Sequence, residues 1–266
     1  MRYRSAPYLS AFRLRALLET QYRVAALSAV VTQAFFGLVL ICLYTALYAG
    51  RDAAALRDVV SYVWLQQIFF RALLSVDQEL RDQIMSGGVA YTLTRPLDQH
   101  LWWTVRALAQ KTVGVAMRLV PMILLQFLLP SDLRLSLPEN GVAFLQFLVS
   151  ITVGFIVISQ IDMIIEAIVL RTLDSRGAAA MINLIMMIFC GNIIPLTFFP
   201  DRVQALIRFQ PFAQALDAPI RMYLAAQPWP EFALNLGVQL SWALVLCALA
   251  RLLWRRNLQR IIIQGG

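Results

Sequence analysis

Few residues in this chain have the types and spacing that enzyme chemistry requires. The only lysine, Lys111, does not follow a glycine run, so the chain lacks the loop with which ATPases hold phosphate. The only histidine, His100, cannot form a two-histidine zinc motif, and its polar neighbours predict a solvated side chain. Ser86-Gly87-Gly88 fits a helix stop followed by a turn. The sequence therefore predicts no catalytic residue, no metal site and no cofactor bound by this chain.

Charged residues inside apolar stretches form a second set of candidates, because each costs about 2.5–3.5 kcal/mol at the centre of a membrane span. Arg118 lies in the middle of an apolar run, and we expect it to face a helix bundle or a wet cavity. Asp162 and Glu166 are four residues apart and so share one helical face. Arg71 is expected to pair with one of these two carboxylates, as a structural ion pair rather than as part of a proton relay.

The elements that position these residues are predicted to be membrane helices. Hydrophobic residues make up 60% of the chain and charged residues only 14%, against about 25% charged in an average soluble domain. The net charge of +8 lies in clusters beside the apolar runs, which is typical of membrane topology and argues against nucleic-acid binding. The fold class is therefore an all-α integral membrane protein. The three cysteines lie in apolar runs without metal or redox spacing and are expected to be free thiols.

Six apolar runs are long enough, or nearly so, to cross a bilayer, which takes about 20 residues. Most lysine and arginine residues face the cytoplasm if both termini do, so we predict cytoplasmic termini and a retained first span. Residues 1–23 are predicted to form an amphipathic helix on the inner leaflet, with a disordered basic leader as the alternative. The whole chain, 1–266, is expected to be one transmembrane domain. The predicted spans are 24–49, 59–76, 103–129, 142–170, 178–199 and 232–254.

Two segments between the predicted spans stand out. Residues 200–230 are too apolar for a solvated loop, and we expect two short helices that dip into the outer leaflet after a kink near Pro195. Residues 77–100 form the longest polar interruption in the first two thirds of the chain. A short helix there would present charges and an apolar knob for a docked partner, with a solvated loop as the alternative. The charges are Glu79, Arg81 and Asp82, and the knob is Leu80, Ile84 and Met85.

Three stretches of the chain resemble a family. Gly88, Leu93, Arg95, Pro96 and Leu97 fit the Gly…Leu-x-Arg-Pro-Leu signature of a subfamily of bacterial type-2 ABC exporter permeases. The outer segment is similar through Pro195 to Pro200, Pro211-Phe212 and Pro219-Ile220, and the tail is similar in ending on Gly265-Gly266. Three isoleucines at 261–263 depart from the aromatic residue that is more usual before those glycines.

The resemblance implies a permease of the bacterial inner membrane that works as a dimer with a copy of itself or with an unlike permease. It also implies two ATP-binding subunits, which would bind the ATP and Mg²⁺, and a coupling helix over 77–88 seated in each of them. Substitution of Glu79, Leu80 and Arg81 is expected to uncouple ATP hydrolysis from transport. An apolar path favours an amphiphilic cargo such as a lipid, a peptide or an antibiotic.

Two other classes of function compete with this interpretation. An ion-coupled secondary carrier would require carboxylates at mid-depth and inverted repeats, whereas Asp162 and Glu166 lie near the predicted inner surface. An intramembrane lipid-modifying enzyme would require clustered acids or histidines at the membrane surface, and Asp77, Glu79 and Asp82 come nearest to that pattern.

Overall fold

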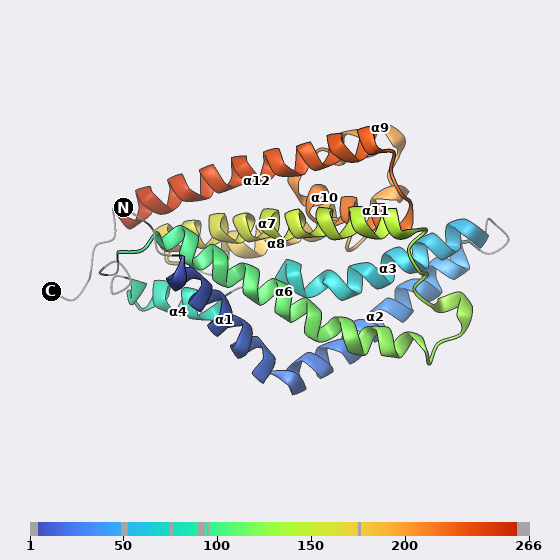
Figure 1. The fold of residues 1–266 in the computed structure, drawn as a ribbon, viewed down its shortest axis with the longest axis horizontal. Helices are drawn as coiled ribbons and strands as arrows, with labels where there is room; N and C mark the ends of the chain where they lie inside the picture. The colour runs from blue at the N-terminus through green and yellow to red at the C-terminus, as the bar shows by residue number, and fades with distance from the viewer. Residues whose placement is uncertain are drawn as a thin grey trace.

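The computed structural model describes residues 5–48, 53–74, 77–89, 94, 96–174 and 177–259, and every regular element in these ranges is a helix. Five of the described helices are long and apolar enough to cross a membrane, which confirms the predicted all-α membrane class (Figure 1). These helices are α2 (Arg23–Leu47), α3 (Ala53–Leu74), α6 (Gln99–Gln126), α7 (Gly141–Thr172) and α12 (Trp229–Leu258).

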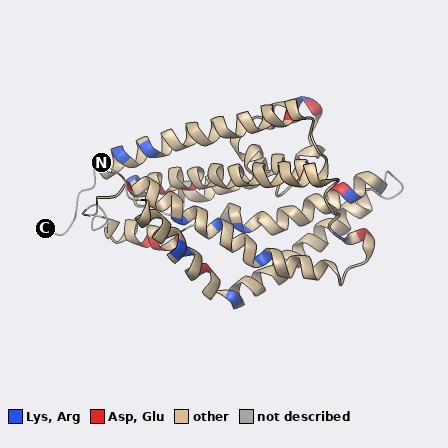
Figure 2. Cartoon of the chain, in the orientation of Figure 1, with Lys and Arg blue, Asp and Glu red and all other residues tan. Residues whose placement is uncertain are grey.

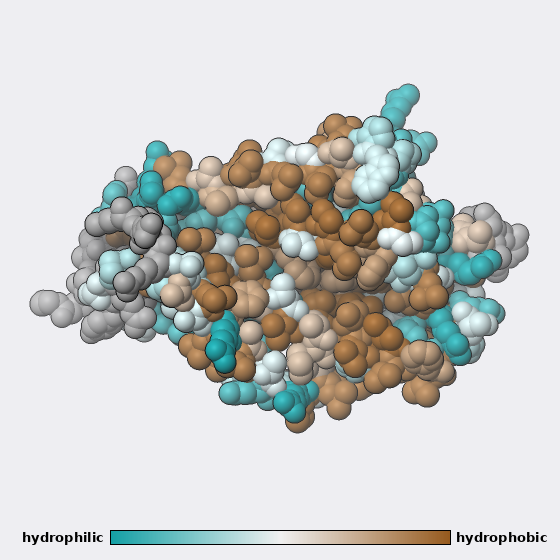
Figure 3. Space-filling view, viewed as in Figure 1, coloured by the Kyte–Doolittle hydropathy of each residue, from teal (hydrophilic) through white to brown (hydrophobic). Residues whose placement is uncertain are grey.

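Helix α7 lies at the centre of the bundle and packs most extensively against α12 (Figure 1). Polar side chains join these two helices along their length, as is common where lipid gives no hydrophobic drive for helix association. Trp254 of α12 donates to the carbonyl of Met163 at 2.8 Å, and Asn257 donates to that of Ala167 at 2.6 Å. A band of apolar surface crosses the face seen in Figure 3, between hydrophilic ends.

The first helix, α1 (Ala6–Gln21), packs against α6 and meets α2 at an elbow formed by Tyr22 (Figure 1). Arg15 and Glu19 are mostly buried against the bundle, whereas Arg13, Leu14 and Leu17 are exposed. Two charged side chains of α1 therefore turn toward the protein, and its exposed leucines turn away from it.

The predicted fifth span, 178–199, is not one continuous helix. Helix α8 (Gly177–Phe189) has 13 residues, so it is about 20 Å long and too short to cross the hydrocarbon core. The chain leaves the helix at Gly191, which has a φ of +79°, and a short 3-10 turn, η2 (Leu196–Phe198), follows. The described residues thus contain five candidate spans and one shorter apolar helix, and the predicted count of six is not confirmed.

The outer segment folds into three short helices where two were predicted. They are α9 (Asp201–Ile207), α10 (Pro211–Ala215) and α11 (Asp217–Leu224), and α10 and α11 pack on α7. Gly154 of α7 permits the close approach, because a Cβ there would lie 2.2 Å from the carbonyl oxygen of Ala215. A second 3-10 turn, η1 (Ser131–Leu133), lies at the same end of the bundle, between α6 and α7.

Candidate functional site

The predicted partner-binding helix exists as α4 (Gln78–Met85). It lies at the end of the bundle where α1 and α6 begin and α12 ends, and it packs on α7 (Figure 1). Asp77 stands at its N-cap position, and Gly87, with a φ of +74°, follows its last residue closely. Acidic and basic residues lie around this end of the molecule and again at the opposite end, with fewer along the long helices between them (Figure 2).

The structure corrects the expected roles of the apolar residues of α4. Leu80 and Ile84, which are 0% and 2% exposed, belong to the hydrophobic core and hold the helix on the bundle. Met85 alone of the predicted knob is accessible, at 48%. The exposed face of α4 instead consists of Gln78, Glu79, Asp82, Met85 and Ser86.

Ion pairs fix α4 to three other helices. Arg81 Nη2 lies 2.5 Å from Glu166 Oε1 on α7. Arg106 of α6 pairs with Asp77 at 3.0 Å and with Glu79, while its guanidinium lies 5.0 Å from the centre of the Trp103 ring. From α1, Arg15 Nη1 reaches within 3.9 Å of Asp77 Oδ1.

A second ion pair lies deeper in the bundle, where Lys111 Nζ is 2.5 Å from Asp162 Oδ2. Lys111 is fully buried and also donates to the carbonyl of Ala72 at 2.8 Å, so it joins α6 to α7 and α3. The pairing of Lys111 with Asp162 was not predicted from the sequence. A single lysine within an apolar helix, with an unassigned aspartate elsewhere, was the signal that could have found this pair.

The predicted pairing of Arg71 with Asp162 or Glu166 was wrong. Arg71 Nη2 lies 3.4 Å from Glu19 Oε2, while Asp162 pairs with Lys111 and Glu166 with Arg81. The physical reason is the packing of α1 against α6, which brings Glu19 to the end of α3. Arg118 lines a cavity of about 340 Å³ beside these residues, in the kind of position expected for it.

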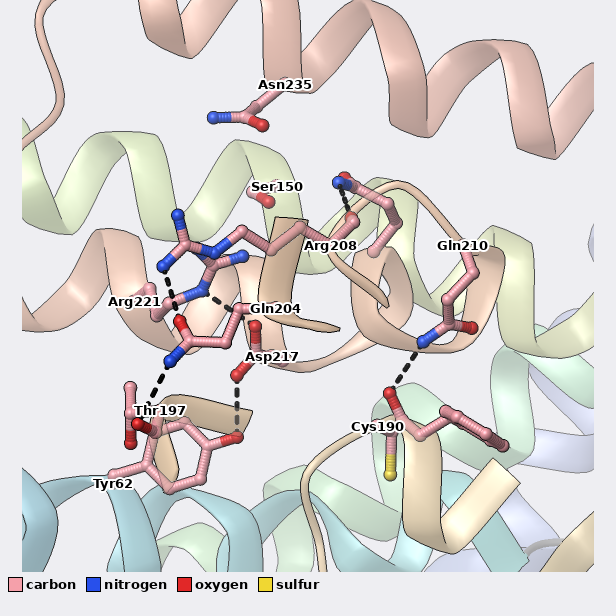
Figure 4. A network of polar contacts seen from close by, with 12 residues as sticks. Tyr62, Ser150, Cys190, Thr197, Gln204, Arg208, Gln210, Asp217, Arg221 and Asn235 are labelled. Carbon is pink, nitrogen blue, oxygen red and sulfur yellow. Dashed lines mark hydrogen bonds and ion pairs between the residues drawn. The ribbon is translucent and has the colours of Figure 1, made fainter. Parts of the chain in front are cut away.

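At the other end of the bundle, a polar network joins the outer segment to α3 (Figure 4). Asp217 is fully buried, accepts from Tyr62 Oη at 2.8 Å and accepts from Arg221 Nε at 2.7 Å. Gln66 of α3 donates to Tyr62 Oη and to the carbonyl of Cys190, both at 3.0 Å. Asp217 was not predicted as a functional residue from the sequence, although it stands in an apolar segment and therefore needed a partner.

The prolines predicted to mark the outer segment stand at its helix boundaries. Pro195 precedes η2, and Pro200 precedes α9. Pro211 is the first residue of α10, with the half-buried Phe212 after it, and Pro219 is buried within α11. These residues shape the backbone and make no polar site of their own.

A family model described as "ABC-2 family transporter protein" matches residues 28–265. The chain belongs to the ABC-2 transporter family. No curated protein matches it. As an ABC-2 permease it is a membrane subunit of an ABC transporter, and that family's membrane subunits are not themselves catalytic.

The signature residues of this ABC-2 permease are described only in part. Leu93 and Arg95 lie outside the described residues, as does the tail beyond 259. Gly88 is half-buried, Pro96 is exposed and Leu97 is half-buried just before α6. The segment leads into Asp98, which caps α6 by accepting from the N–H of Leu101 at 3.1 Å and also pairs with Arg251 of α12.

His100 differs from the expectation of a solvated side chain. It is buried, at 6% exposure, and one ring nitrogen lies 3.0 Å from Gln160 Oε1 on α7. Together with Asp98 and Arg106, it gives the first two turns of α6 polar links to other parts of the permease. These contacts tie α4 and the start of α6 to α7 and α12.

Proposed function

We propose that this permease is the transmembrane subunit of an ATP-driven exporter and that a separate ATP-binding subunit docks on α4. One observation carries the proposal: α4 has a buried side tied to α1, α6 and α7 by ion pairs, and an exposed side open to a partner. The exposed side combines the carboxylates of Glu79 and Asp82 with the apolar side chain of Met85. A polar rim around an apolar centre is the usual composition of a reversible interface.

The ion pairs give this contact a mechanical role. A force applied to α4 by nucleotide-driven closure of the ATP-binding subunits would reach α7 through Arg81 and Glu166, and α6 through Asp77 and Arg106. Packed helices respond to such a push by moving as rigid bodies between two arrangements. ATP and Mg²⁺ would be bound by the ATP-binding subunits, and the permease would alternate between inward-facing and outward-facing states.

The orientation and the oligomeric state belong to the same proposal. The end of α12 beside α4 carries Arg251, Arg255 and Arg256, and the positive-inside rule favours the cytoplasm of a bacterial cell for that end. Two such permeases, either copies or unlike subunits, would pair to form the path. Helix α2 exposes Phe35 and Phe36 among other large apolar side chains, a surface suited to lipid or to a second permease.

The experiment uses a tagged full-length permease purified from its own membranes in mild detergent, with Mg²⁺-dependent ATPase activity as the readout. Asp82→Arg combined with Met85→Asp reverses the character of the exposed face of α4 and should remove the co-purifying ATPase activity. Asp132→Arg is the matched control, because Asp132 is exposed in η1 at the opposite end of the bundle.

The proposal fails if purified wild-type permease carries no ATPase and transports amphiphiles in vesicles on an ion gradient alone, since that result identifies a secondary carrier. It also fails if the double variant keeps its ATPase while remaining as stable as the control. A lipid-modifying activity of the purified chain, lost in Asp77→Asn and Glu79→Gln variants, would support the enzyme class instead.

A further inference from the structure

A cavity of about 340 Å³ lies at the elbow between α1 and α2, where α3 and α6 complete its wall. We call it the elbow cavity and define it by six of its lining residues, namely Arg15, Glu19, Tyr22, Arg71, Gly114 and Arg118. Gln78 of α4 also lines it, and it is separate from the Asp217 network at the other end of the bundle. Three arginines and a single glutamate stand among these residues, an unusual composition for a cavity inside a membrane protein.

The charges of the elbow cavity do not balance. Glu19 lies 3.1 Å from Arg15 and 3.4 Å from Arg71, so one carboxylate serves two guanidinium groups. Asp77, which Arg15 approaches to 3.9 Å, is already paired with Arg106 at 3.0 Å. No carboxylate in the described parts of the chain forms an ion pair with Arg118. Because arginine remains protonated in proteins, the six residues carry two more positive charges than negative ones.

Arg118 is also short of hydrogen-bond acceptors. Its Nε and Nη1 atoms are buried and have no partner among the described residues. Buried guanidinium nitrogens of this kind are normally satisfied by an acceptor, and a phosphate group accepts two parallel N–H bonds from one arginine. The electrostatics and the unpaired donors of Arg118 therefore favour the same ligand, a compact anion with several oxygens.

The backbone of α6 opens the space for this arrangement. Side chains on a helix lean toward its N-terminus, so Arg118 leans from mid-helix toward the α4 end, and a long arginine can reach the polar boundary of the membrane in this way. Gly114 lies one turn nearer that end. A Cβ at Gly114 would lie 3.3 Å from Arg71 Cγ and 3.6 Å from Glu19 Oε2, so the glycine lets both side chains lie against α6.

The surroundings of the cavity indicate that the anion belongs to a lipid. Tyr22, at 66% exposure, stands at the elbow, and Leu17, Val24 and Leu27 are exposed on the helices that lead to it and away from it. These apolar side chains suit acyl chains lying along the start of α2, which is a candidate membrane span. A soluble phosphate would make no use of them. The cavity thus offers a basic interior next to an apolar surface, as a phospholipid requires.

We propose that the elbow cavity binds the phosphate headgroup of an anionic phospholipid from the leaflet on the α4 side. Arg118 and Arg71 would contact the phosphate, and the acyl chains would pack beside α2. The lipid would complete the contact between α1 and the bundle, which rests on Glu19 as the shared partner of Arg15 and Arg71. This inference is distinct from ATPase docking, because the arginines that would contact the phosphate lie on α3 and α6 and not on α4.

The test measures lipid binding to the purified full-length permease by native mass spectrometry. Phosphatidylglycerol should bind about tenfold or more tightly than phosphatidylcholine with the same acyl chains, because both lipids carry the phosphate but the quaternary ammonium of choline would meet the excess positive charge of the cavity. Inorganic phosphate and glycerol 3-phosphate, added as competitors, should leave the bound lipid in place. Equal binding of the two lipids would overturn the proposal, and displacement by either soluble anion would overturn its lipid part.

Variants locate the site. Arg118→Met should weaken phosphatidylglycerol binding about tenfold, because a charge-assisted hydrogen-bonding group is lost. Arg118→Lys should lie between Arg118→Met and wild type, since lysine keeps the charge but cannot donate two parallel N–H bonds. Arg57→Gln is the matched control, because Arg57 is an exposed arginine at the opposite end of α3. Arg118→Met is expected to be at least as stable as wild type without lipid, so misfolding is not the expected cause of lost binding. Unchanged lipid affinity in a folded Arg118→Met protein would refute the site.

Discussion

The Nζ atom of Lys111 lies 2.5 Å from the Oδ2 atom of Asp162, at a site where Lys111 has no exposed surface. The two residues come from α6 and α7, and the lysine also bonds to the backbone of α3. Three helices of the bundle therefore meet at one buried charge pair. Such a pair contributes little net stability over an apolar replacement, but losing one partner leaves an uncompensated charge in the interior.

Removing one partner of this pair should destabilise the protein much more than replacing both partners with apolar residues. Lys111→Met alone is expected to destabilise the permease by about 3–5 kcal/mol, because Asp162 would remain buried and charged. The double variant Lys111→Met/Asp162→Leu should recover most of the lost stability. Thermal unfolding of the detergent-purified protein checks this, and a double variant no more stable than the single one would contradict it.

The pair of Arg81 and Glu166 should control how firmly α4 is held. Arg81→Met leaves the nearly buried Glu166 carboxylate without its partner, so cleavage of α4 by an added protease should rise about tenfold or more. Exchange of the two charges, Arg81→Glu/Glu166→Arg, should restore part of the protection. Equal cleavage of wild type and Arg81→Met would show that the pair does not anchor the helix.

Truncation of two apolar residues of α4 should change the stability of the protein by very different amounts. Leu80→Ala removes a fully buried side chain and should cost about 2–5 kcal/mol of unfolding free energy. Met85→Ala removes an accessible one and should change stability by no more than about 0.5 kcal/mol, while weakening partner docking. Chemical denaturation of both variants provides the comparison. A larger cost for Met85→Ala would reverse the assignment of buried and exposed faces.

Gly191 should tolerate no side chain. Alanine there would adopt a φ near +79° and would place its Cβ 2.1 Å from the Tyr62 hydroxyl, which bonds to Asp217 (Figure 4). Gly191→Ala is therefore expected to cost about 2 kcal/mol or more.

The control for Gly191→Ala is Gly237→Ala, in the middle of α12, where an added Cβ meets nothing within 4 Å. It should stabilise the protein by about 0.5–1 kcal/mol, since alanine is the better helix former. Thermal unfolding compares the two variants, and an equal effect of both would contradict the close packing of Tyr62 against Gly191.

Hydropathy alone located four of the long helices well. The predicted runs at 24–49, 103–129, 142–170 and 232–254 correspond to α2, α6, α7 and α12 with small shifts at their ends. The run at 178–199 is not one continuous helix, because an apolar stretch does not reveal where a helix stops. Gly191 and Pro195 indicated a kink, but the packing of Tyr62 beside Gly191 could not be inferred, because the two residues lie far apart in the sequence.

The candidate site was predictable in outline and not in detail. The polar content of 77–88 correctly indicated a short helix, yet which of its faces is buried depends on α7 and α6. The partner of Arg71 could not be inferred, because it required knowing that α1 packs against α6 and so presents Glu19. The burial of His100 was missed for the same reason, since Gln160 on α7 supplies its hydrogen bond.

The distance along the chain between Arg81 and Glu166, 85 residues, has a consequence for biosynthesis. Arg81 leaves the ribosome well before its counter-ion has been made, so α4 lacks its ion pair with α7 until that helix is synthesised, although Arg15 and Arg106 precede Glu166 in the chain. A nascent chain released shortly before residue 166 would thus hold α4 less firmly than one that extends past it.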